Sequence, residues 1–190
     1  MTKDPGVAYM QNTSVYDLNG MPMAGNTFNY PAMHASDLLL TDQDYSARRD
    51  LAISSCMVSA IPQIDLSPYA MIDLILGAQR FDGYSHRNYQ TFPEYLQQAL
   101  TAYTATGGSL MVSGAYLGED LRTAEQRDFA YKILKYMYTD NVRTDSMQVR
   151  GMGTEFGIAS LPNPHIYHTA RVNTIQPTEG AFATLLFNES

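Results

Sequence analysis

AMIDLIL, residues 70–76, and SLMVS, residues 109–113, are the two stretches that decide the fold. Both are short and almost continuously apolar, which is typical of strands that are covered on both faces in a parallel sheet. The sequence between them predicts a helix over residues 92–106, with apolar residues at helical spacing. Because a strand, a helix and a second strand at this spacing form a right-handed crossover, we expect the two stretches to be neighbouring parallel strands.

The expected helix has signals at both ends. Thr91 and Glu94 have capping-box spacing, and Pro93 lies in the first turn. Gly107 and Gly108 follow the last turn, where glycine commonly ends a helix. The expected apolar stripe consists of Tyr95, Leu96, Ala99, Leu100 and Tyr103.

A second helix is expected from Thr123 to about Tyr138. Thr123 and Gln126 repeat the capping-box spacing at its start. Its expected stripe consists of Phe129, Ala130, Ile133, Leu134 and Met137. The resulting βαβα unit predicts an α/β fold in three layers, with helices on both faces of a mostly parallel sheet.

The rest of the chain has weaker signals. Residues 1–33 have no sustained period and many turn-forming residues, so we expect an irregular N-terminal extension or insertion before an α/β domain at residues 34–190. The further expected elements are a helix over 34–40, a loop over 78–91, and strands over 49–56, 146–151, 155–159 and 181–187.

The composition excludes several classes of protein. The chain has 190 residues and a net charge of −7, so the phosphate backbone of a nucleic acid would be repelled on average. No apolar run approaches the roughly 20 residues that span a bilayer. The single cysteine, Cys56, excludes an internal disulfide and a multi-cysteine metal site. Fourteen tyrosines without a tryptophan suit interfaces and sugar-facing surfaces.

A ligand cleft is expected beyond the carboxyl ends of the strands, as in other open α/β sheets. The residues at those ends are Ser54, Ser55, Cys56, Gly77, Gln79, Arg80 and the turn over residues 114–120.

The turn Gly114-x-Tyr116-x-Gly118 has the pattern of an elbow that exposes a nucleophile between a strand and a helix. Class I glutamine amidotransferases carry a cysteine at the central position, and serine hydrolases carry a serine. Tyrosine stands there in this chain, and a phenol with an ordinary pKa of about 10 is a poor nucleophile for acyl transfer. The pattern therefore predicts the elbow without its reactive atom.

Other candidate residues have a simpler structural interpretation. Ser113 is expected to be packed at a strand end, and Cys56 to behave as a small buried hydrophobe. His165 and His168 lie in a proline-bracketed loop, without a third metal ligand at a suitable spacing. The acidic pair at 119–120 could line the cleft, but we favour a role as first-turn acids of the following helix.

Several strings together resemble, in the same order, exported proteins known as xanthan lyases, which often carry a golvesin-like carbohydrate-associated domain. The resemblance covers roughly residues 20–187. The strings that carry it are AGNTFNYP at 24–31 with His34 after it, IDLILG at 72–77, TFP at 91–93, GGSLMVSGAY at 107–116 and QPTEGA at 176–181.

The resemblance implies a flavodoxin-like, amidotransferase-like domain of an exported, multidomain protein of the periplasm or cell surface. It also implies that the chain is trimmed, because members usually have a strand upstream of Asp4 and further strand sequence after Phe187. A lyase would need a Tyr or His base and a residue that neutralises the uronate carboxylate. Tyr116, Arg80 and Asn26 would have to fill these roles, and no sequence spacing places them together.

Two function hypotheses follow. The first is a module that supports polysaccharide processing or binding and lacks glutaminase activity. The second is a catalytic polysaccharide lyase or hydrolase that uses a cleft around Tyr116, with Glu119 and Arg80 as further catalytic candidates. The expected partners are carbohydrate and other domains of the parent protein, with no nucleic acid, cofactor or metal. The candidate ligand-binding residues are Asn26, Gln79, Arg80, Tyr116, Glu119 and Asp120.

Overall fold

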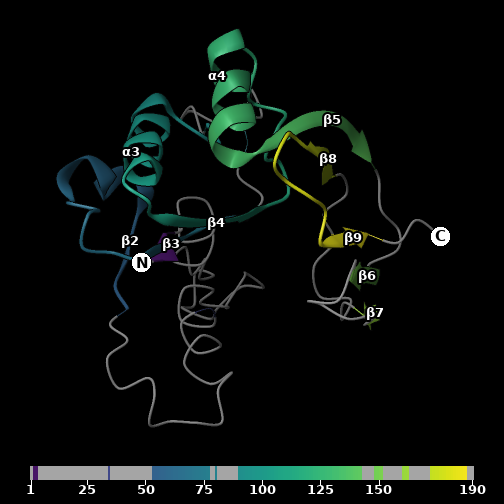
Figure 1. The fold of residues 1–190 in the computed structure, drawn as a ribbon, viewed down its shortest axis with the longest axis horizontal. Helices are drawn as coiled ribbons and strands as arrows, with labels where there is room; N and C mark the ends of the chain where they lie inside the picture. The colour runs from purple at the N-terminus through teal and green to yellow at the C-terminus, as the bar shows by residue number, and fades with distance from the viewer. Residues whose placement is uncertain are drawn as a thin grey trace, which may run out of the picture. The chain divides into compact units, whose positions relative to one another are not determined.

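The computed structural model of the chain describes residues 2–3, 34, 53–77, 80, 90–142, 148–151, 160–162 and 172–187 (Figure 1). The chain divides into two compact units, Met1–Gly114 and Ala115–Ser190. The described strands of the first unit form a parallel sheet, and those of the second form antiparallel ladders. The expected α/β class is thus confirmed as a mixture of helices with small parallel and antiparallel sheets.

The sheet of the first unit has the strand order β2-β1-β3-β4. The four strands are β1 (Thr2–Lys3), β2 (Ser55–Cys56), β3 (Met71–Gly77) and β4 (Ser109–Gly114). The expected pairing of the two apolar stretches is confirmed, because β3 and β4 are parallel neighbours, with Met71 opposite Ser109 and Asp73 opposite Met111.

β1 was not expected. The resemblance implied that strand sequence upstream of Asp4 would be missing, yet Thr2 and Lys3 pair with both β2 and β3. β1 therefore holds an inner position in the sheet, and β2 lies at its edge. Cys56, which was expected to be largely buried, lies on that edge strand and is half-buried.

Helix α3 (Glu94–Ala105) is the expected crossover between β3 and β4, and it lies over one face of the sheet (Figure 1). Leu96 and Leu100 are fully buried, and burying a leucine side chain stabilises the fold by about 1.5–3 kcal/mol. Tyr103 is buried as well and donates a hydrogen bond from its hydroxyl to the carbonyl of Tyr69, at 2.7 Å. Of the predicted stripe, Tyr95 is 39% exposed.

The two ends of α3 differ from each other in how well they were predicted. The N-cap is Pro93, which has no side-chain oxygen, so the capping box expected from Thr91 and Glu94 is wrong. Instead, Thr91 is buried, with 1% of its surface exposed. The expected glycine stop is confirmed, because Gly107 has a φ of +87° and a Cβ on Gly108 would lie 2.2 Å from the ring of Tyr103.

The helix of the second unit is shorter than expected. It consists of α4 (Ala124–Phe129) and a π-helical turn, Ala130–Leu134. The predicted capping box at its start is confirmed, with the Thr123 hydroxyl accepting from the Gln126 amide and the Gln126 side chain accepting from the Thr123 amide. Lys135 then adopts a left-handed conformation, with a φ of 63°, which ends the helix.

Residues 136–138, which were expected to continue that helix, begin strand β5 (Tyr136–Val142). Met137 is consequently 44% exposed and belongs to no helical stripe. β5 pairs antiparallel with β8 (Val172–Pro177), a strand that the sequence analysis did not predict.

The remaining described strands form a three-stranded antiparallel sheet in the order β7-β6-β9. β6 (Gln148–Gly151) and β9 (Leu185–Phe187) fall within two of the expected strands, and β7 (Ser160–Pro162) was not expected. The strand predicted over 155–159 lies outside the described residues. So does the predicted helix over 34–40, apart from His34, which is helical.

Candidate functional site

The residues predicted to line a cleft belong to both units. Arg80 follows β3 in the first unit and is half-buried. Tyr116, Glu119 and Asp120 belong to one turn at the start of the second unit. The predicted residues Asn26, Gln79, His165 and His168 lie outside the described residues.

The turn over residues 115–120, called here the Tyr116 turn, is held by a side chain from β8. The Oδ1 atom of Asn173 accepts hydrogen bonds from the backbone amides of Gly118, at 2.7 Å, and Glu119, at 2.8 Å. The backbone amide of Asn173 donates to the carbonyl of Ala115, at 2.8 Å. A segment distant in sequence thus fixes both the beginning and the end of the turn.

Two residues of β5 reinforce this arrangement. Asn173 donates from Nδ2 to Oδ1 of Asn141, which orients its amide group so that the oxygen faces the turn. The hydroxyl of Tyr136 donates to the carbonyl of Leu117, at 2.5 Å. Burial raises the pKa of Tyr136 far above its ordinary value, so this phenol stays protonated and remains a donor over the physiological range.

The Tyr116 turn is not a sharp passage from a strand into a helix. β4 ends at Gly114 and α4 begins at Ala124, so residues 115–123 separate them. Only 7% of the surface of Tyr116 is exposed. A nucleophile elbow needs an exposed side chain at the central position, whereas this side chain is packed inside the protein.

The backbone donors of the turn are also occupied. In acyl-transfer sites, adjacent backbone N–H groups stabilise the oxyanion of the tetrahedral intermediate. The successive amides of Gly118 and Glu119 have this character, but both already donate to Asn173. A substrate oxygen would have to displace that side chain before it could use either donor.

The two acidic residues of the turn do not lie in the first turn of the following helix, where they were expected. Glu119 and Asp120 were favoured as first-turn acids of the helix, but α4 begins at Ala124, and Glu125 is the acid of its first turn. Asp120 is buried, and the guanidinium of Arg122 lies 4.0 Å from its carboxylate. The interpretation of these two residues as helix-dipole acids is therefore wrong.

The structure also shows a buried acid that the cleft prediction missed. Asp73 lies in the middle of β3 with 3% of its surface exposed, and its Oδ2 is 2.6 Å from Nδ1 of His34. Its other oxygen, Oδ1, has no hydrogen-bond partner among the described residues. The sequence signal was a single carboxylate inside an apolar strand, because a buried acid requires a partner.

No family model matches the chain, and no curated protein or solved structure is significantly similar to it. Within the part of the chain that the structure describes, no helix is long and apolar enough to cross a membrane. The fold and the contacts described above are therefore the basis for a functional argument.

Proposed function

We propose that this chain is a non-amidotransferase module of an exported protein, and that it supports the binding or processing of an acidic polysaccharide. The observation that carries the non-amidotransferase part of the proposal is the occupied Tyr116 turn. Its central side chain is 7% exposed, and Asn173 accepts from the successive amides of Gly118 and Glu119. The turn therefore lacks an accessible nucleophile, and the amides of Gly118 and Glu119 are already paired with Asn173.

The finer fold proposal is a flavodoxin-like sheet. The described parallel strands have the order β2-β1-β3-β4, and flavodoxin-like sheets have the order 2-1-3-4-5. α3 connects β3 and β4 as a crossover helix, which such a sheet requires. These two observations support the proposal, and the resemblance of residues 20–187 to xanthan lyases is consistent with it.

The same strand order suggests where a ligand would bind. In open α/β sheets the ligand site lies beyond the carboxyl ends of the strands, where the strand order reverses. Here that point lies between β1 and β3, and Arg80 follows the last residue of β3, Gly77, by three positions. A guanidinium is well suited to bind a uronate carboxylate, because it can donate two parallel hydrogen bonds.

The test is a binding and product assay of the chain with xanthan, alginate, pectate and neutral dextran. We expect retention on the acidic polymers and not on dextran. We also expect no glutamate released from glutamine and no unsaturated uronate, the ultraviolet-absorbing product of β-elimination. Release of glutamate above the blank would overturn the non-amidotransferase proposal. Failure to bind any acidic polymer would overturn the polysaccharide proposal.

A matched pair of variants locates the binding. Arg80→Gln should weaken retention on the acidic polymers by about tenfold, since it removes one charge-assisted contact. Arg127→Gln is the control, because this arginine is exposed and belongs to the second unit. Equal loss in both variants would mean that binding depends on total charge rather than on the carboxyl end of β3.

A further inference from the structure

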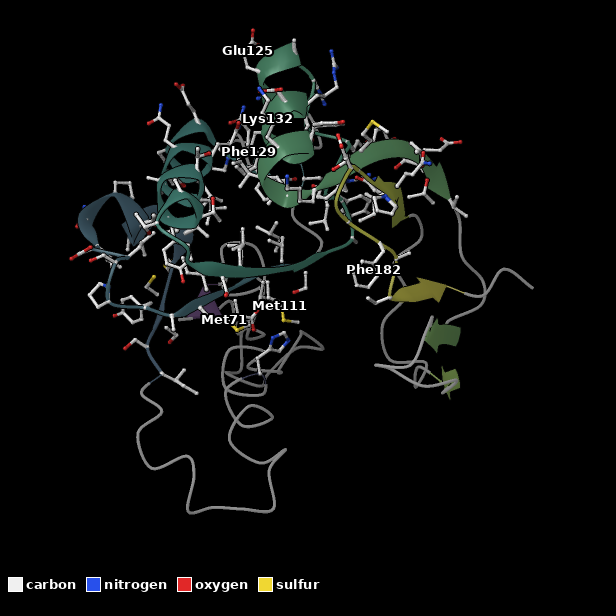
Figure 2. The ribbon with its side chains drawn as sticks, in the orientation of Figure 1. Met71, Met111, Glu125, Phe129, Lys132 and Phe182 are labelled. Carbon is white, nitrogen blue, oxygen red and sulfur yellow. The ribbon has the colours of Figure 1, made fainter. Side chains whose placement is uncertain are left out.

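One face of the first unit's sheet carries a group of side chains that the proposed function does not use. Alternation along a strand places Met71 and Asp73 on the face opposite to Ile72 and Leu74. Met111 lies directly across from Asp73 on β4. Figure 2 shows Met71 and Met111 side by side on the face away from α3.

His34 joins this face through Asp73. Its Nδ1 is 2.6 Å from Oδ2 of Asp73, and the two side chains are 27% and 5% exposed, respectively. A neutral imidazole that donates from Nδ1 keeps an acceptor lone pair on Nε2. Histidines that bind a metal are commonly held in this way, with a carboxylate on the opposite ring nitrogen fixing the tautomer and the orientation.

Met71 and Met111 carry thioether sulfurs on the same face of the sheet. Met111 is 48% exposed and Met71 is half-buried, so this face is partly open to solvent. Strand spacing and rise place their Cα atoms about 8 Å apart, within reach of two flexible thioether side chains. Thioether sulfur together with imidazole nitrogen is a soft ligand set, which selects copper(I) over zinc and magnesium.

We propose that Met71, Met111 and His34 bind one copper(I) ion, with Asp73 positioning the imidazole from behind. The charge of the pair supports this choice. The Oδ1 of the buried Asp73 carboxylate has no hydrogen-bond partner among the described residues, and a nearby monovalent cation would compensate its charge.

The experiment titrates the chain with copper(I) under ascorbate, in competition with bicinchoninate, and with zinc(II) in parallel. We expect one equivalent of copper(I) to bind and zinc(II) to bind at least about a hundredfold more weakly, following the preference of soft ligands. Silver(I), a redox-inert substitute, should shift the Cε methyl resonances of Met71 and Met111. Absence of copper(I) binding, or equal binding of zinc(II), would overturn the proposal.

Four variants assign the ligands. Met71→Leu and Met111→Leu conserve volume, and each should weaken copper(I) binding about tenfold or more, as should His34→Ala. Asp73→Asn should weaken it about tenfold to a hundredfold through the orientation of the imidazole. Met57→Leu is the control, because Met57 is 49% exposed in the same unit but lies outside this group. Copper(I) binding that survives in the Met71→Leu/Met111→Leu double variant would refute the assignment. The shifts of the methionine methyl resonances when silver(I) binds to the wild type test the same assignment without any variant.

Discussion

The two units contain similar sequence signals and reach different structures. In each, an expected capping box is followed by a helical apolar stripe and then by a strand. After α3 the chain returns to the sheet it left, and β4 pairs parallel with β3. After the helix of the second unit, β5 pairs antiparallel with β8, a strand some 30 residues further along the chain.

The helix ends account for much of this difference. Thr106, Gly107 and Gly108 separate α3 from β4, and Gly107 adopts its positive φ without steric cost. A single residue, Lys135, separates the π-helical turn from β5 and adopts a left-handed conformation that costs a side-chain-bearing residue about 1–2 kcal/mol. Helical spacing thus identifies a helix, but its end and the next strand's partner depend on the residues that follow.

The largest expected effect is in the crossover of the first unit. Leu100→Ala removes a fully buried side chain and should lower the free energy of unfolding by about 2–5 kcal/mol. Gln98→Ala, at an exposed position of the same helix, should change it by about 0.5 kcal/mol or less. Urea unfolding followed by circular dichroism measures both. Similar costs for the two variants would mean that α3 does not pack as described.

In the second unit, the hydrogen bonds of Asn173 should carry the next largest effect. Asn173→Ala leaves the amides of Gly118 and Glu119 without their acceptor and should cost about 1–3 kcal/mol. Asn173→Asp keeps an acceptor oxygen for both amides and loses the donor to Asn141, so its cost should be smaller. Thermal unfolding of the two variants checks this order. An equal or larger cost for Asn173→Asp would contradict the described contacts.

Substitutions at the residues that end the two helices should change stability in opposite directions. Gly107→Ala places a side chain at a φ of +87° and should destabilise the protein by about 1–2 kcal/mol. Lys135→Gly relieves the same strain at a φ of 63° and should stabilise it by about 0.5–1 kcal/mol. The midpoints of urea unfolding of the two variants measure these changes in stability, which should have opposite signs. A destabilising Lys135→Gly would show that the left-handed residue is not the cause of the helix end.

The smallest expected difference in stability is between variants at the N-terminal ends of helices α4 and α3. Thr123→Ala removes a capping side chain that the structure shows and should cost about 1 kcal/mol. Glu94→Ala removes the corresponding residue of a capping box that α3 lacks, and it should be nearly neutral. Chemical unfolding of the two variants distinguishes them. A larger loss of stability for Glu94→Ala than for Thr123→Ala would indicate that Glu94 does cap α3, as its spacing from Thr91 predicts.

The β3–α3–β4 segment of the first unit was predictable because its signals are local and agree with each other. Two apolar strands and one apolar stripe leave a single sensible pairing, which β3, α3 and β4 adopt. The Tyr116 turn was not predictable in the same way. Its spacing of glycines matches an elbow, but its conformation depends on Asn173, a residue more than 50 positions away along the chain. Nothing in the local sequence indicates that contact.

The buried pair was missed for a related reason. Asp73 was included in an apolar strand, although a carboxylate at such a position requires a partner. That partner, His34, is 39 residues away in sequence. An acid in a covered strand is therefore a signal for a long-range contact, but it does not identify the partner.

The central claim is that the Tyr116 turn is a packed structural element held by Asn173, and amide hydrogen exchange tests it most directly. The amides of Gly118 and Glu119 donate to Asn173 at 2.7 and 2.8 Å, so in the folded chain both should exchange far more slowly than in an unstructured peptide. In Asn173→Ala both should lose this protection, while the amide of Leu74, inside the parallel sheet, should keep its own. Rapid exchange of Gly118 and Glu119 in the wild type would contradict the account, because those donors would then be open to a substrate.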